Sequence, residues 1–153
     1  MTFLHTAAQT ATLAATLAAT LALSATAALA HDGVHIDDPY ARFLPGAKSG
    51  AAFFVIENHA TVDDRLVAVT ADVAEKSELH THKMDASGMM QMGPIEGGIV
   101  IPAGESHALE RGGDHVMMMM LTRVPKEGEV IGLTLTFEHA GAVTVEVPVD
   151  NHR

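Results

Sequence analysis

Short runs of alternating apolar and polar residues dominate the chain beyond residue 30. In 131–138, the residues Leu133, Leu135 and Phe137 alternate with polar neighbours, and valines alternate in the same way in 143–149. Because side chains of a strand point alternately to opposite faces, this pattern predicts half-buried strands. No segment beyond residue 30 has the 3.6-residue apolar period of an amphipathic helix.

Further strands are predicted between frequent Gly, Pro and Asp turn signals. They are 36–40, 50–57, 66–69, 78–84, 89–92, 99–101 and 115–121. Residues 72–76 are predicted to form one helical turn or a bend, and the acidic pairs Asp37-Asp38 and Asp63-Asp64 to be solvated turns. About eight or nine short strands favour an all-β fold, a Greek-key β-sandwich of immunoglobulin-like type. An antiparallel barrel is the alternative.

The first thirty residues have a different pattern. Residues 7–30 are almost entirely Ala, Leu and Thr without charge, and they end in Ala28-Leu29-Ala30, which is typical of a signal-peptidase site. We therefore predict a cleaved signal peptide over 1–30, a single domain over 31–153 and export to the periplasm. Residues 1–10 lack the usual Lys or Arg, and an uncleaved membrane anchor is the alternative.

Charge and cysteine content narrow the possible partners. All Lys, Arg, Asp and Glu lie beyond residue 30, so the formal net charge of −10 belongs to the predicted domain. That charge argues against nucleic acid and anionic membrane surfaces as partners. The chain has no cysteine, and therefore neither a disulfide framework nor a thiolate nucleophile. It also lacks Gly-x-Ser-x-Gly and His-Glu-x-x-His motifs, and we expect no enzymatic activity.

Methionine and histidine gather in one part of the chain. Apart from Met1, every methionine lies between Met84 and Met120, with His80 just before this interval and His115 within it. Thioether sulfur is a soft neutral ligand that suits Cu(I), whereas zinc prefers thiolate, imidazole or carboxylate. The segment therefore predicts a Cu(I) site.

Strand periodicity selects the ligands of this site. His115, Met117, Met119 and Leu121 should share one face of their strand, and Val116, Met118 and Met120 the other. A turn at 85–88 should bring Met92 close to His80. The predicted metal ligands are His80, Met92, His115 and Met117. Methionine also fills cores well, so packing alone is the competing explanation.

Other histidines suggest a second metal. His82 and Met84 share the strand face of His80, and cleavage after Ala30 would give His31 a free α-amine beside its imidazole, a pair able to chelate Cu(II). His82, Met84 and His31 are therefore possible secondary metal ligands. A frayed terminus with incidental histidines is the alternative for His31.

The segment 80–121 resembles the periplasmic copper chaperone family PCuAC. That family has a His, a Met about a dozen residues on, and a His-x-Met some twenty residues later, which corresponds here to His80, Met92 and His115-x-Met117. The sequence segments 92–98, 101–104 and 112–117 are also similar to members of that family. The chain differs from many members by having Thr81 after the first His, an additional His82, and no His- and Met-rich tail beyond His152.

The resemblance implies a cupredoxin-like sandwich that carries Cu(I) in the periplasm. It further implies a copper-accepting partner, such as the CuA centre of cytochrome c oxidase or another periplasmic copper carrier. Alternatives are a copper-sequestering or resistance protein, a histidine-brace copper enzyme that uses His31, and a β-sandwich interaction module without metal. With these departures from the family pattern, the resemblance implies the core Cu(I) site but no second Cu(II) site.

Overall fold

Residues 33–153 are described by a computed structural model; the predicted signal peptide over 1–30, and His31, lie outside these described residues. The described part forms ten strands and no helix. The strands are β1 (Val34–Arg42), β2 (Ser49–Asn58), β3 (Asp64–Ala71), β4 (Ala74–Met84), β5 (Met90–Pro94), β6 (Ile99–Ile101), β7 (Ser106–Leu109), β8 (His115–Leu121), β9 (Val130–Phe137) and β10 (Gly141–Pro148). No helix within 33–153 is long and apolar enough to cross a bilayer.

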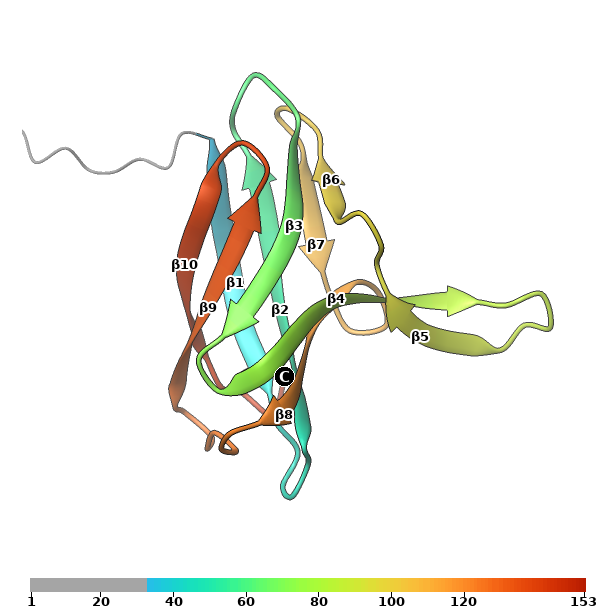
Figure 1. Ribbon diagram of the computed structural model, residues 1–153, viewed down its shortest axis with the longest axis vertical. Coiled ribbons are helices and arrows are strands. Elements are labelled where there is room, and N and C mark those ends of the chain that lie inside the picture. The colour runs from blue at the N-terminus through green and yellow to red at the C-terminus, as the bar shows by residue number, and fades with distance from the viewer. Residues whose placement is uncertain (1–32) are drawn as a thin grey trace, which may run out of the picture.

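The strands form two antiparallel sheets that pack face to face (Figure 1). One sheet has the order β1-β2-β8-β4-β5, with β7 also paired to β2, and the other has the order β10-β9-β3-β6. Neighbours in the sheets are often distant in sequence, as β2 and β8 are. The predicted all-β sandwich is therefore confirmed.

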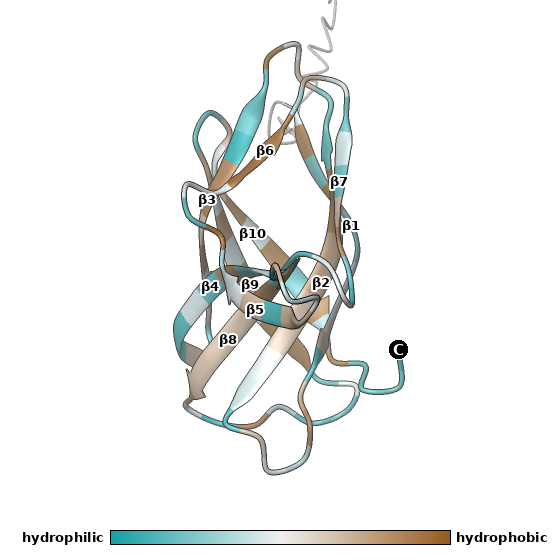
Figure 2. Ribbon diagram, turned by 90° about the vertical axis from the view of Figure 1, so that its right-hand side faces the viewer, coloured by the Kyte–Doolittle hydropathy of each residue, from teal (hydrophilic) through white to brown (hydrophobic). Residues whose placement is uncertain are grey.

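The β4–β5 hairpin leaves the sandwich. The first part of β4 pairs with β8, from Ala74 to His80, and the second part pairs only with β5, from His80 to Met84. In Figure 1 this hairpin projects to the right of the sandwich, and in Figure 2 it points toward the viewer. His80 lies where the two pairings meet.

The predicted alternation places the core between the sheets. In β9, Leu133 and Leu135 are fully buried and Phe137 is 2% exposed, while Thr134 and Thr136 are only partly covered. In β8, Val116 and Met118 are fully buried. Burying such side chains provides most of the driving force for folding, at about 25 cal/mol per Å² of apolar surface.

The end of β8 departs from the predicted alternation. Met120 was expected to share the face of Met118, which is fully buried, but Met120 is 54% exposed, and Leu121 instead packs against the core. The reason is the backbone of Met120, which has a φ of 51°. A single left-handed residue rotates the strand and exchanges the two faces beyond it.

Several further details of the sequence analysis need correction. The chain bends at 72–73, within the segment expected to turn, but β4 already begins at Ala74. The strand β7 was not predicted, because its four residues include only two apolar ones. Asp64 is only 5% exposed rather than solvated, since its carboxylate accepts hydrogen bonds from the backbone N–H groups of Arg65, His139 and Ala140. Asp37 and Asp38 lie within β1, at an irregularity of its pairing with β2, rather than in a turn.

Candidate metal centre

Histidine and methionine side chains gather on the outer face of the first sheet. In the registers of β4, β5 and β8, His80 lies opposite His115, and His82 lies opposite Met92. Residues directly opposed in neighbouring strands share a face, as do residues two apart in one strand. Met117 therefore lies on the face that carries all of these side chains. The other face of β4 and β8 carries buried Leu79, Val116 and Met118.

The imidazole rings of three histidines lie close together. The ring centroids of His80 and His115 are 6.0 Å apart, and those of His82 and His115 are 5.3 Å apart. A metal–imidazole bond is about 2.0 Å long, so these separations leave room for one ion between ring nitrogens. His115 is only 3% exposed. The cluster therefore lies at the boundary between core and solvent.

Hydrogen bonds select the nitrogen that each ring can offer. The carbonyl oxygen of Gly113 lies 3.1 Å from Nδ1 of His115 and 3.2 Å from Nδ1 of His82. A carbonyl only accepts, so both rings must carry a proton on Nδ1 for these bonds, and their Nε2 lone pairs remain available. A ligand histidine commonly donates its other ring N–H in this way.

His80 is held in the opposite sense. Its Nε2 lies 3.2 Å from the carboxylate of Glu78, which only accepts hydrogen bonds, so the ring carries its proton on Nε2 and Nδ1 keeps a free lone pair. That Nδ1 is buried and has no hydrogen-bond partner within residues 33–153. Buried polar nitrogens are rarely left unsatisfied, because the desolvation costs about 1–3 kcal/mol. A metal bound at Nδ1 would satisfy this atom, so the residues fit a metal ion.

The loop before β8 fixes the shared carbonyl. The Gly113 N–H donates to the carbonyl of Glu110, and the Glu110 N–H donates to the carbonyl of Asp114. His107 in β7 contacts the carboxylate of Asp114 at 2.9 Å. These bonds position Gly113 between the rings of His82 and His115.

Burial keeps His115 neutral. Desolvation lowers the pKa of His115. The hydrogen bond to the Gly113 carbonyl opposes this shift in part, the nearby His82 and His80 add smaller lowering effects, and Asp114 adds the smallest, raising one. Hydrogen bonds from Lys76 and His80 lower the pKa of Glu78, so its carboxylate stays ionised and able to accept. The neutral imidazole is the form that binds metal.

The predicted sulfur ligands differ in exposure. Met117 is partly buried beside His115, whereas Met92 is 51% exposed on β5 and lies diagonally from His80. Thus His80, His115 and Met117 come from directly paired strands, and Met92 reaches the same face from the hairpin. His82 stands between them, and Met84 lies farther out and is 68% exposed.

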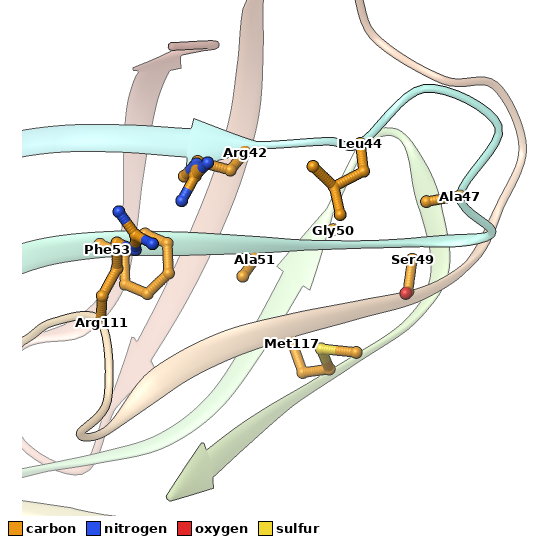
Figure 3. Close-up of a pocket in the computed structure, with 9 residues that line it drawn as sticks. All are labelled: Arg42, Leu44, Ala47, Ser49, Gly50, Ala51, Phe53, Arg111 and Met117. Atoms are coloured by element: carbon orange, nitrogen blue, oxygen red, sulfur yellow. The ribbon is translucent and has the colours of Figure 1, made fainter. Parts of the chain in front are cut away.

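A pocket of about 390 Å³ opens beside Met117. Figure 3 shows Met117 on one side of it, with Arg42 and Arg111 approaching from β1 and from the loop before β8. Phe53 contributes an aromatic wall, and its ring centroid lies 6.2 Å from that of His115. The pocket gives solvent or a partner access to the sulfur of Met117.

Two contributors to the cluster were not predicted. Glu78 lies two residues before His80 on the same strand but was given no role, and a backbone carbonyl such as that of Gly113 leaves no signal in the sequence. Within residues 33–153, no group of three or more His, Cys, Asp or Glu side chains is arranged to hold a metal ion.

Comparisons with known proteins identify relatives of the described domain. The sequence profile of the LpqE-like family, described as "Putative lipoprotein LpqE-like", matches residues 34–149. A curated relative named "Putative lipoprotein Lxx21020", from Leifsonia xyli subsp. xyli, is 30% identical over 118 residues, which are 77% of this chain and 70% of the relative. Neither description denotes an enzyme.

Solved structures share the fold. The copper-bound PCuAC domain from PmoF2 superposes with a TM-score of 0.64 at 24% identity, covering 77% of this chain and 92% of that domain. The Cu(I) form of DR1885 from Deinococcus radiodurans superposes with a TM-score of 0.59 at 27% identity, covering 78% of this chain and 81% of that protein. The fold is therefore that of the PCuAC domains, as the sequence resemblance implied.

Proposed function

The chain belongs to the LpqE-like family, which is the PCuAC family, and from this premise we propose that it is an exported copper metallochaperone. It would bind one Cu(I) through His80, His115, Met117 and Met92, and it would act as a carrier rather than as an enzyme. The proposal joins the chemistry of the outer face to the copper-bound state of two structural neighbours.

The unsatisfied Nδ1 of His80 carries this proposal. It lies on a residue paired directly with His115, whose own Nε2 lone pair is available, and Met117 follows on the same face. Two imidazoles and two thioethers are all neutral, so they leave the single charge of Cu(I) unquenched and favour it over Cu(II). Four such donors also suit a d¹⁰ ion, which has no strong geometric preference.

The sequence also supports export. We propose that residues 1–30 are a signal peptide and that 31–153 form the exported copper-binding domain, in line with the lipoprotein names of relatives. After cleavage the chain would act in the periplasm without a membrane span of its own. A possible Cu(II) pair at His31 stays a hypothesis.

Methionine variants test the metal site. Leu is close to Met in volume, and such swaps usually cost less than about 1.5 kcal/mol of stability. Met117→Leu and Met92→Leu should each weaken Cu(I) binding at least about tenfold, because each removes a soft ligand. Met118→Leu, fully buried on the opposite face, should bind Cu(I) like the parent.

Competition with a Cu(I) chelator measures these affinities. Unchanged affinity in both Met117→Leu and Met92→Leu would assign the methionines to packing and remove the proposed site. Thermal unfolding of the apo proteins checks that the three variants fold alike.

Delivery and sequestration are separated by gene deletion. We propose delivery, with the CuA centre of cytochrome c oxidase or another periplasmic carrier as acceptor. Loss of the protein should then lower oxidase activity, and added copper should restore it. Copper sensitivity with normal oxidase would instead support the sequestering role.

A further inference from the structure

Methionines not needed for the proposed site crowd the projecting hairpin. Met84 is 68% exposed, Met89 is 65% exposed and Met90 is 57% exposed. Exposed apolar side chains on a narrow two-stranded arm gain little from packing, since β5 pairs only with β4. Their presence there needs another reason.

The soft donors at the paired positions of the hairpin lie on one face, while Met89 lies in the turn outside this pairing. Met84 is directly opposite Met90, and His82 is directly opposite Met92. The alternate positions carry Thr81 and Lys83, opposite Gly93 and Gln91. Among its paired positions, the arm therefore has one face with thioethers and an imidazole, and one face without sulfur.

The hairpin turn holds this face in register. The carboxylate of Asp85 accepts hydrogen bonds from the backbone N–H groups of Ser87 and Met89, from the Ser87 hydroxyl and from the Gln91 amide. The Asp85 N–H in turn donates to the Met89 carbonyl. Met84 and Met90 directly flank this turn, so their backbone positions are fixed.

His82 supplies an imidazole nitrogen to the same face. Its Nδ1 contacts the Gly113 carbonyl at 3.2 Å, which leaves the Nε2 lone pair for a ligand. Residues two apart in a strand are separated by about 6.6 Å. His82 is therefore one such step from Met84 and one step from His80, so it lies between the hairpin methionines and the inner cluster.

We propose that Met84, Met90 and His82 form a second, solvent-exposed site for a soft monovalent ion, Cu(I) or its analogue Ag(I). The inference rests on the proposed function, because the outer site would load the inner one. Met92 lies opposite His82, and its thioether can exchange between the two sites. Cargo moves inward by ligand substitution alone, with no change in oxidation state.

Silver titration with methionine methyl NMR tests the second site. Ag(I) has the charge and the d¹⁰ configuration of Cu(I) and does not undergo redox chemistry in the titration. The parent protein, labelled with ¹³C at its methionine methyl groups, should take up two equivalents. The methyl signals of Met117 and Met92 should shift with the first, and those of Met84 and Met90 with the second.

Matched variants separate the hairpin from exposed methionine in general. The double variant Met84→Leu with Met90→Leu should take up one equivalent. Met120→Leu removes a methionine that is 54% exposed at the far end of β8, and it should still take up two. A second equivalent that survives the double variant, or disappears with Met120→Leu, overturns the hairpin site.

The same spectra separate failure of this inference from failure of the proposed function. Saturation at one equivalent, with Met117 shifted and Met84 and Met90 unchanged, overturns the outer site and leaves the inner one; the hairpin methionines would then be a docking patch. Shifts at Met84 and Met90 with Met117 unchanged would support the outer site and overturn the inner one. No shift at any methionine overturns both.

Discussion

The two sheets bury polar groups in opposite ways. In the second sheet, Asp64 is 5% exposed, and its carboxylate accepts three backbone N–H groups. In the first sheet, His115 is 3% exposed, and the buried Nδ1 of the neighbouring His80 has no partner among the described residues. A satisfied buried group stabilises a fold, whereas an unsatisfied one costs free energy unless a ligand completes it.

The outer faces of the sheets differ in the same sense. The inward residues of β9 and β8 are equivalent apolar side chains, such as Leu135 and Met118. The outward residues of β9 include Thr134 and Thr136, which suit a solvated strand, while β8 presents His115 and Met117 at the corresponding positions. The alternation determines which side chains face outward, and their chemistry distinguishes a structural sheet from one that can bind a metal.

The largest effect should follow from removing an imidazole of the first sheet. His115→Ala should weaken Cu(I) binding by more than about 100-fold, since changes outside the ligand shell alone cost about 10–100-fold. Thr136→Ala, an outward change in the second sheet, should leave the affinity unchanged. Competition with a Cu(I) chelator compares the two variants, and equal affinities would contradict the claim that only the first sheet binds the metal.

A change at Asp64 should lower the stability of the domain and leave its copper affinity unchanged. Asp64→Asn replaces one accepting oxygen by an amide donor that faces backbone N–H groups, and we expect a loss of about 1–3 kcal/mol in the free energy of unfolding. Cu(I) affinity should stay at the parental value, measured on the folded fraction. Urea unfolding gives the stability, and a parallel loss of copper affinity would show that the sheets are not independent.

The smallest effect should be a difference in pH dependence. Because burial lowers the pKa of His115 from 6.5, the unfolded chain binds a proton there more readily than the folded one. Apo stability should therefore fall as the pH drops below 6.5 toward the folded pKa. His115→Gln should flatten this part of a melting-temperature profile.

Asp64 acts in a different pH window. Burial raises the pKa of its carboxyl, but the N–H groups of His139, Ala140 and Arg65 together lower it below 3.8. Its stabilising contribution is present above 3.8 and is lost as the pH falls through the lower, folded value. For His115, a melting temperature of the parent protein that stays constant between pH 6.5 and 4 would contradict the destabilisation expected when this residue is protonated.

Local patterns predicted most strands but not their long-range partners. The bounds 99–101 and 115–121 agree with β6 and β8 as observed, because alternation and turn residues are properties of neighbouring positions. Asp64 could not be predicted as buried, since its donors His139 and Ala140 are 75 and 76 residues away. The reversal at Met120 depends on one backbone angle, to which residue type is a weak guide.

The candidate site divides along the same line. His115 and Met117 could be placed on one face from their spacing alone, and the turn at 85–88 brought Met92 to the face of His80. The register adds that Met92 lies opposite His82, whereas His80 lies opposite His115 and Pro94. The role of the Gly113 carbonyl could not be predicted, because the backbone of every residue carries the same carbonyl group, whatever its side chain.

The position of His80 at the branch of β4 affects how the molecule can open. His80 is the last residue of the pairing with β8 and the first of the pairing with β5. The β4–β5 pairing beyond His80 can therefore open locally at low cost in free energy while the sandwich stays folded, as edge segments with few buried contacts do. Such an opening carries Met92 away and leaves His80 opposite His115. Amide protons of β5 should then exchange with solvent sooner than those of β8, and the escape rate of the ion would be set by the arm rather than by the global stability of the domain.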